Sequence, residues 1–295
     1  MFICKLFIEF MIYSFFGWMY ECAYCTLKEG HWSNRGFLFG PICPIYGLGC
    51  IGCELVFGVL PFFKGIPYAQ IPIWKIFLIC AVGSIFLEYG TSLLLEKKFH
   101  AVWWDYKDFP LNINGRVCVP ATMGFGVAGI FVTRFVLPVA EGIKAAVPVP
   151  LAEIIALLLM GYLAADLVLT VSSLMQLLEM VEGAMGEFDE KMEEAFKVAA
   201  ATPSKAKEAI TAVPGKAKDA FLAAPGKAKE ALINYEEAIR ANVSKQAQRL
   251  NFRQEYELKS IKKFRFRKPT VKKNVSAEKM SDYYKRLQDR VKSDK

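Results

Sequence analysis

The chain has 295 residues, and its 54% hydrophobic content, 14% aromatic content and positive mean hydropathy exclude an ordinary soluble domain of that length. Residues 1–174 contain 11 Lys/Arg and 11 Asp/Glu, whereas residues 175–295 contain 26 and 18. The net charge of +8 therefore belongs entirely to the second part, and the boundary between an apolar and a basic part lies near residue 180.

Five apolar segments in the first 180 residues are long enough to be membrane spans, which need about 20 residues to cross the hydrocarbon core. The predicted fold is an all-α, polytopic membrane helix bundle of about five transmembrane helices with Gly/Pro-broken cytoplasmic loops. The first segment lacks the basic start of a cleaved signal peptide, so we expect it to remain as a span. The predicted transmembrane domain is 1–180, with spans at 6–27, 40–62, 71–95, 117–139 and 150–178.

All eight cysteines lie in the apolar part, where Cys serves mainly as a small packing residue. Cys22-Ala-Tyr-Cys25 and Cys50-Ile-Gly-Cys53 have the spacing of some metal sites, but neither has a His or an acidic cluster nearby. We therefore predict no metal, no cofactor and no disulfide framework.

Charged residues at the ends of the first and third spans predict a polar cavity that opens toward the cytoplasm. Glu21 and Glu88 close these spans, and a charge at membrane depth normally faces a partner or a cavity. Each is followed by a loop broken by Gly and Pro, whose backbone must be satisfied by protein or water. Structural ion pairs that only hold the bundle together are the alternative interpretation. The candidate cavity residues are Glu21, Asn34, Arg35, Glu88, Asp105, Asn112, Asn114 and Arg116.

The two broken loops also share a spacing of glycine and proline. Gly36, Pro41 and Gly47 are spaced as Gly115, Pro120 and Gly126 are. This match predicts a parallel duplication of a two-helix unit, with chance agreement in a glycine-rich sequence as the alternative.

The distribution of Lys and Arg predicts the orientation of the chain in the membrane. The loops 28–39 and 96–116 and the basic tail carry most of these residues, and such segments stay on the cytoplasmic side. We expect a plasma-membrane protein with its N-terminus outside and its C-terminal tail in the cytoplasm.

Residues 181–234 form an Ala/Lys/Glu-rich segment with an 11-residue repeat. Three units begin at Pro203, Pro214 and Pro225, and each predicts a short helix opened by proline. The apolar stripe of each unit is too thin to make a core. A solvated, semi-rigid linker is favoured over a helix lying on the membrane surface.

The basic tail, residues 235–295, is predicted to be helical or partly disordered. Between Ser260 and Pro269 cations alternate with aromatic residues, a pattern that next to a bilayer attracts anionic lipid. A plain solvated tail is the alternative, and nucleic acid is not the expected partner. The candidate lipid-binding residues are Lys262, Lys263, Arg265, Arg267 and Lys268.

Several of these motifs also resemble a known family of membrane proteins from Gram-positive bacteria, the CmpB-like type IV ABC-transporter family. The resemblance covers roughly residues 5–140 and leaves the basic tail outside. It implies a plasma-membrane transporter component, without implying a substrate or a mechanism. The motifs are Phe16-Gly-Trp18 with Glu21, Asn34-Arg-Gly-Phe-Leu-Phe-Gly-Pro-Ile-Cys-Pro-Ile-Tyr-Gly47, Trp104-Asp-Tyr106 and Asn112-Ile-Asn-Gly-Arg116.

No Gly-x4-Gly-Lys-Ser/Thr loop for binding ATP occurs in the sequence. The leading hypothesis is therefore a transporter permease component without its own ATPase, with the lipid bilayer and a separate ATPase subunit as expected partners and a homo-oligomer left open. A membrane scaffold that recruits a partner through its tail is one alternative. An intramembrane lipid-modifying enzyme is another, although Gly-x-Ser-x-Gly and His-Glu-x-x-His signatures are missing.

Overall fold

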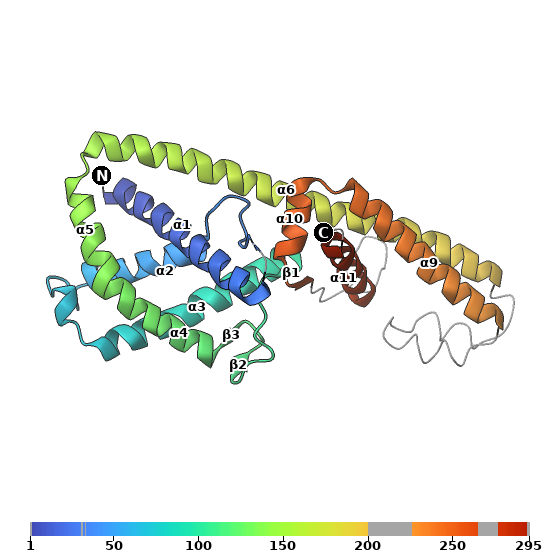
Figure 1. Ribbon diagram of the computed structural model, residues 1–295, viewed down its shortest axis with the longest axis horizontal. Helices are drawn as coiled ribbons and strands as arrows, with labels where there is room; N and C mark the ends of the chain where they lie inside the picture. The colour runs from blue at the N-terminus through green and yellow to red at the C-terminus, as the bar shows by residue number, and fades with distance from the viewer. Residues whose placement is uncertain (1, 31, 33, 200–225, 265–276, 294–295) are drawn as a thin grey trace. The chain divides into compact units, whose positions relative to one another are not determined.

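The computed structural model describes all residues except 1, 31, 33, 200–225, 265–276 and 294–295 (Figure 1). It divides into two compact units, each of which draws on two separate stretches of the chain. Unit 1 comprises Met1–Lys98 and Trp103–Val171, and unit 2 comprises Phe99–Val102 and Ser172–Lys295.

Four helices are long and apolar enough to cross a membrane: Phe2–Lys28, Ile73–Phe99, Val119–Ala146 and Val149–Gly183. Only 17–28% of their most apolar windows is buried inside the protein, so many of their apolar side chains are exposed, as lipid-facing residues are. Phe86 and Leu158, for example, are 74% and 71% exposed. These findings confirm the predicted all-α membrane helix bundle. The second predicted span, 40–62, corresponds to a shorter apolar helical stretch, Pro44–Val59.

The helices of this part follow one another along the chain, joined by loops of different lengths (Figure 1). Two of them contain π-helical turns, η1 and η3, a feature that frequently marks functional sites. Pro138 follows η3, and its ring would clash with the carbonyl of Arg134, which accounts for the widened turn there. The elements are α1 Phe2–Glu29, α2 Pro44–Glu54, η1 Leu55–Val59, the 3-10 turn η2 Tyr68–Gln70, α3 Ile73–Phe99, α4 Val119–Phe131, η3 Val132–Val136, α5 Leu137–Ala146 and α6 Val149–Ala199.

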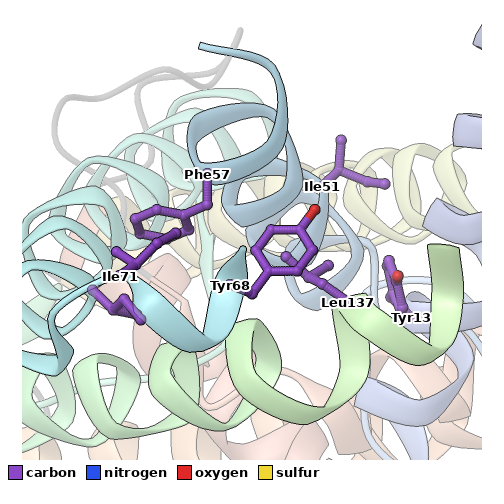
Figure 2. Packing of buried hydrophobic residues seen from close by; sticks show 7 residues of the cluster. Tyr13, Ile51, Phe57, Tyr68, Ile71 and Leu137 are labelled. Atoms are coloured by element: carbon purple, nitrogen blue, oxygen red, sulfur yellow. The ribbon is translucent and has the colours of Figure 1, made fainter. Parts of the chain in front are cut away.

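Helices α1 and α2 pack closely because α2 presents a glycine at their contact. A Cβ atom at Gly47 would collide with the Ser14 hydroxyl and with Phe10, so only glycine fits there. Around η1, η2 and η3 the apolar core of unit 1 gathers residues from several elements. Figure 2 shows this cluster, which consists of Tyr13, Ile51, Phe57, Tyr68, Ile71, Ile76 and Leu137.

The non-helical loop before α2 is satisfied by the protein around it. The backbone N–H of Gly40 donates to Asp166 Oδ2 at 3.0 Å, and that of Phe39 donates to Thr170 Oγ1 at 3.3 Å, both on α6. Cys43 donates its N–H to the carbonyl of Ser14 at 2.9 Å. Asp166, a charge within the last predicted span, therefore serves as an acceptor that holds this loop.

Unit 2 contains the described part of the basic tail, and it has a buried core. Antiparallel pairing joins β1 to β4, with Ala101 opposite Phe264 and Val102 opposite Lys263. Leu177, Leu258 and Leu287 are fully buried in this unit. Its elements, besides the end of α6, are β1 Ala101–Val102, α9 Gly226–Arg249, α10 Phe252–Ser260, β4 Lys263–Phe264 and α11 Ala277–Ser293.

A core in the tail was not expected, because residues 235–295 were predicted only to be helical or partly disordered. Its basis is the spacing of Tyr283, Tyr284, Leu287 and Val291, which places one apolar stripe along α11. The repeat units that begin at Pro203 and Pro214 lie outside the described residues, and α9 begins within the third unit, at Gly226.

The predicted lipid-binding cluster begins in this unit. Lys262 is exposed and donates its backbone N–H to the carbonyl of Val102 at 2.8 Å, while Lys263 lies half-buried in β4. Arg265, Arg267 and Lys268 lie outside the described residues.

Candidate polar site in the membrane bundle

Glu21 lies on α1, where it faces α2. Its Oε2 accepts a hydrogen bond from the Tyr46 hydroxyl at 2.5 Å. Tyr46 stands immediately before Gly47, so the close approach of the two helices brings its ring to α1. A short, charge-assisted bond of this kind fixes both side chains.

Glu88 lies on α3 and is only 4% exposed. Its Oε1 accepts a hydrogen bond from the Tyr106 hydroxyl at 3.1 Å. Its buried Oε2 accepts no hydrogen bond from the residues that the structure describes. A buried carboxyl oxygen without a donor is costly, so this atom is a place where a bound group can gain a contact.

Glu21 lies within electrostatic range of Glu88. Burial is the main cause that raises the pKa of Tyr106. The charge of Glu88 raises this pKa further, and the charge of Glu21 makes a smaller contribution. Tyr106 therefore remains a neutral hydrogen-bond donor at physiological pH. We call the group of Glu21, Tyr46, Glu88 and Tyr106 the acid–tyrosine site.

A β-hairpin places Tyr106 in this site. Strands β2 (Asn112–Ile113) and β3 (Val117–Cys118) pair in antiparallel fashion, joined through Asn114-Gly115, whose φ angles are +55° and +70°. The N–H of Arg116 donates to the carbonyl of Ile113 at 3.0 Å, which completes a type I′ turn, the turn that Asn-Gly favours. The carbonyl of Gly115 then accepts the N–H of Tyr106 at 2.8 Å.

Three predicted cavity residues stabilise this hairpin segment. Asn112 donates through Nδ2 to the carbonyls of Lys107 and Phe109, at 3.1 and 2.9 Å. Asp105 accepts the N–H of Lys107 at 3.3 Å. Asn114 donates to the Tyr89 hydroxyl on α3 at 3.1 Å. These bonds hold the loop that carries Tyr106.

Arg116 is directed to a different acid from those of the site. It is 2% exposed and donates to Glu96 Oε2 through Nη1 at 2.9 Å and Nη2 at 2.7 Å. Its guanidinium also lies over the ring of Tyr89, 5.4 Å from the centroid. Glu96, which was not among the predicted cavity residues, lies two turns beyond Glu88 on α3.

Asn34 and Arg35 lie against α1, where they contact residues within one turn of Glu21. Asn34 Oδ1 accepts the indole N–H of Trp18 at 2.7 Å, and the thiol of Cys22 is 3.6 Å from the same oxygen. The backbone N–H of Arg35 donates to Cys22 Sγ at 3.5 Å. Asn34 and the backbone of Arg35 thus anchor the first loop to α1.

The structure therefore gives Glu21 and Glu88 one tyrosine partner each, and neither tyrosine was among the predicted cavity residues. Both tyrosines lie in segments that resemble the family motifs. Tyr46 lies in Pro44-Ile-Tyr46-Gly47, and Tyr106 lies in Trp104-Asp-Tyr106. Among the described residues, no group of three or more His, Cys, Asp or Glu side chains gathers to hold a metal ion.

An all-α bundle of long, outward-facing apolar helices with buried acids between them defines a helical membrane protein. Residues 8–171 match the model of the family described as "Putative ABC-transporter type IV". The match covers more than half of the chain, and the chain belongs to this family, which makes it a transporter-related membrane protein. Neither a curated protein nor a solved structure matches the chain.

Proposed function

We propose that the chain is the permease component of a transport system and that the acid–tyrosine site lies on its transport path. The observation that carries this proposal is the pair of glutamates inside apolar helices, Glu21 on α1 and Glu88 on α3, each of which accepts a hydrogen bond from a tyrosine hydroxyl. Acids inside membrane helices are rare and mark substrate or ion pathways more often than lipid-facing surfaces. Unpartnered Glu88 Oε2 supplies an acceptor within this group.

The chemistry of the site favours a cationic group, or one that donates hydrogen bonds. Its acids supply carboxylate acceptors, and the tyrosine hydroxyls of Tyr46 and Tyr106 already donate to them. Arg116 is bound to Glu96 and so does not neutralise Glu88. A transported group that carries N–H donors would supply the hydrogen bonds that these acceptors lack.

The proposed arrangement in the cell follows from the charge distribution and from the family. We place the N-terminus outside the plasma membrane and the tail in the cytoplasm, because residues 175–295 carry 26 of the 37 Lys and Arg residues. A separate cytoplasmic ATPase chain would supply the energy, since the sequence has no phosphate-binding loop of its own.

Purification of the full chain from its native membranes in mild detergent tests this proposal. We expect a chain with a Gly-x4-Gly-Lys-Ser/Thr loop to co-purify, and the complex to hydrolyse ATP. Glu21→Gln and Glu88→Gln should preserve assembly and lower ATP hydrolysis severalfold, whereas Glu153→Gln, at an exposed acid on α6, should not. Absence of an ATPase chain, or equal activity of all three variants, would contradict the proposal.

A scaffold that recruits a partner through its tail is the second candidate, favoured by the core of unit 2. Leu287 is fully buried there, so Leu287→Asp should unfold this unit by burying a charge. If recruitment is the function, Leu287→Asp abolishes co-purification of partners while Glu88→Gln leaves it intact. If transport is the function, Glu88→Gln is also inactive, although its partners remain bound.

A further inference from the structure

Two glutamates and one lysine meet where α1 begins and α5 ends, outside the acid–tyrosine site. Lys144 Nζ lies 2.9 Å from Glu9 Oε2, and it also binds Glu54 Oε1. Glu9 and Glu54 are 8% and 5% exposed. One ammonium group neutralises one carboxylate, so a second negative charge would remain buried, at a high cost in free energy.

The two carboxyl groups contact the same ammonium nitrogen, that of Lys144, and therefore lie close to one another. Two carboxylates cannot form a hydrogen bond with each other, because neither has a hydrogen to donate. In addition, the buried oxygens Glu9 Oε1 and Glu54 Oε2 accept no hydrogen bond from the residues that the structure describes. A single proton held by the pair removes the surplus charge and supplies the missing donor at the same time.

Tyr13 points to the same place from α1, one turn after Glu9. Tyr13 belongs to the cluster shown in Figure 2. Its hydroxyl is buried and has no hydrogen-bond partner among the described residues. It lies within electrostatic range of both glutamates. An unpartnered hydroxyl beside a carboxyl pair can donate to whichever oxygen lacks the proton.

The other charged groups nearby are already engaged. Lys5 Nζ donates to the carbonyls of Lys144 and Val147, at 2.6 and 2.8 Å. Arg134 donates to the carbonyls of Tyr68 and Ile71, at 2.5 Å each. Glu141 accepts the Tyr68 hydroxyl at 2.8 Å. The titratable and charged groups on the packed elements are Lys5 and Tyr13 on α1, Cys50 on α2, Tyr68 on η2, Arg134 on η3, and Glu141 and Lys144 on α5.

The backbone around Glu54 is also unusual. Glu54 is the last residue of α2 and the N-cap of the π-helical turn η1. A π-turn changes the direction of the side chains beside it, and such turns occur frequently at functional sites in helices.

We propose that Glu9 and Glu54 bind one exchangeable proton between them, with Lys144 balancing the remaining charge. When the proton leaves, two negative charges face one ammonium group; when it returns, the site is neutral. The Tyr13 hydroxyl donates to the oxygen that is left without a hydrogen bond. This proposal does not rest on the transport function, because proton binding is a property of the purified chain.

Infrared spectroscopy of the full chain in detergent tests the proposal, since a protonated carboxyl group has a stretching band that a carboxylate lacks. We expect Glu9→Gln and Glu54→Gln each to remove the same single band near neutral pH. The double variant should remove no more than either single one, because the proton is shared. Glu153→Gln is the matched control, an exposed acid near the start of α6, and should leave the band unchanged.

Lys144→Met provides a second test that does not depend on loss of a signal. Without the ammonium group both acids should be protonated, and the band should grow to that of two groups. The proposal is overturned if neither Gln variant loses a band although both remain folded by size-exclusion chromatography. It is overturned too if the double variant loses twice the signal, or if sodium ions remove the band at constant pH, which would make this a metal-cation site.

Discussion

Arg116 and Glu96 form an ion pair in which both side chains are 2% exposed, with Nη1 and Nη2 of the arginine at 2.9 and 2.7 Å from one carboxylate oxygen. Because Arg116 immediately precedes β3 and Glu96 lies near the end of α3, the pair joins the hairpin to the helix. It thereby fixes the segment that carries Tyr106, without being part of the acid–tyrosine site.

Removal of one member of this pair should destabilise the protein strongly. Arg116→Met leaves Glu96 as a buried charge without its cation, a change that typically costs about 3–5 kcal/mol. The double variant Arg116→Met/Glu96→Leu should recover much of that loss, because it buries no charge. Thermal unfolding in detergent, followed by tryptophan fluorescence, measures both. Equal stability of the single variant and the wild type would show that the pair contributes little.

The packing of α1 on α2 predicts different outcomes for two neighbouring glycines. A Cβ at Gly47 would collide with the Ser14 hydroxyl and Phe10, whereas nothing lies within 4 Å of a Cβ at Gly49. Gly47→Ala should therefore lower the unfolding free energy by about 1–3 kcal/mol. Gly49→Ala should be neutral or stabilising, since alanine favours the helix. Unfolding midpoints measured side by side decide this, and indistinguishable midpoints would contradict the close contact.

Gln288 should be important for the order of unit 2. Its buried side-chain amide donates to the carbonyls of Leu258 and Ile261, at 2.8 and 2.9 Å, at the end of α10. Gln288→Met keeps the volume but leaves both carbonyls without this donor, at a cost of about 1–3 kcal/mol. Hydrogen exchange should become faster in α10 and α11. Lys292→Met, at an exposed position, is the control, and similar exchange in both variants would argue against the role.

The stability of unit 2 should fall at high pH. Burial raises the pKa of Tyr283 to about 12 from an ordinary value of 10. A group whose folded pKa is raised contributes stability below its unfolded pKa, and this is lost as pH rises toward the folded pKa. Circular dichroism should therefore show loss of helix beginning above about pH 10. Tyr283→Phe, which loses only the bond to Asn242, should weaken this dependence, and an unchanged profile would refute it.

The basic cluster is predicted to bind anionic membranes weakly. Lys262 is exposed at its start, and each Lys or Arg near an anionic surface contributes about 1 kcal/mol. Binding of the detergent-purified chain to anionic vesicles should fall as salt rises and on substitution by Gln of Lys262, Lys263, Arg265, Arg267 and Lys268. Equal binding to neutral vesicles would exclude an electrostatic cause, and tighter binding to RNA would redirect the assignment.

Helices were predictable from the sequence where a long apolar run allowed one interpretation, as in 71–95 and α3. Loop structure was harder to predict from the sequence. Asn114-Gly115 is a strong signal for a hairpin turn, yet the segment was interpreted only as a Gly/Pro-broken loop. The stripe on α11 was overlooked because the tail was judged by its charge, and a charged helix with one apolar face can still pack.

Acids were easier to predict than their partners. Glu21 and Glu88 stand out as charges in apolar spans, but which residues face them depends on helix rotation and on the hairpin, which spacing along the chain does not specify. Arg116 follows Glu88 in an apparently equivalent loop and yet pairs with Glu96. Glu9 lay within the first predicted span, and its partner Lys144 lies far away in sequence, so no local pattern joined them.

The pairing of β1 with β4 bears on how this protein is synthesised. Residue 264 follows residue 101 by 163 positions, so β1 leaves the ribosome long before its partner strand exists. Closing so long a loop costs entropy and delays the contact. The last apolar helix must already have been delivered to the membrane when the tail completes its fold. A chain that ended between residues 183 and 264 would have all its membrane helices, while its β1 edge would still be open to pairing with another strand.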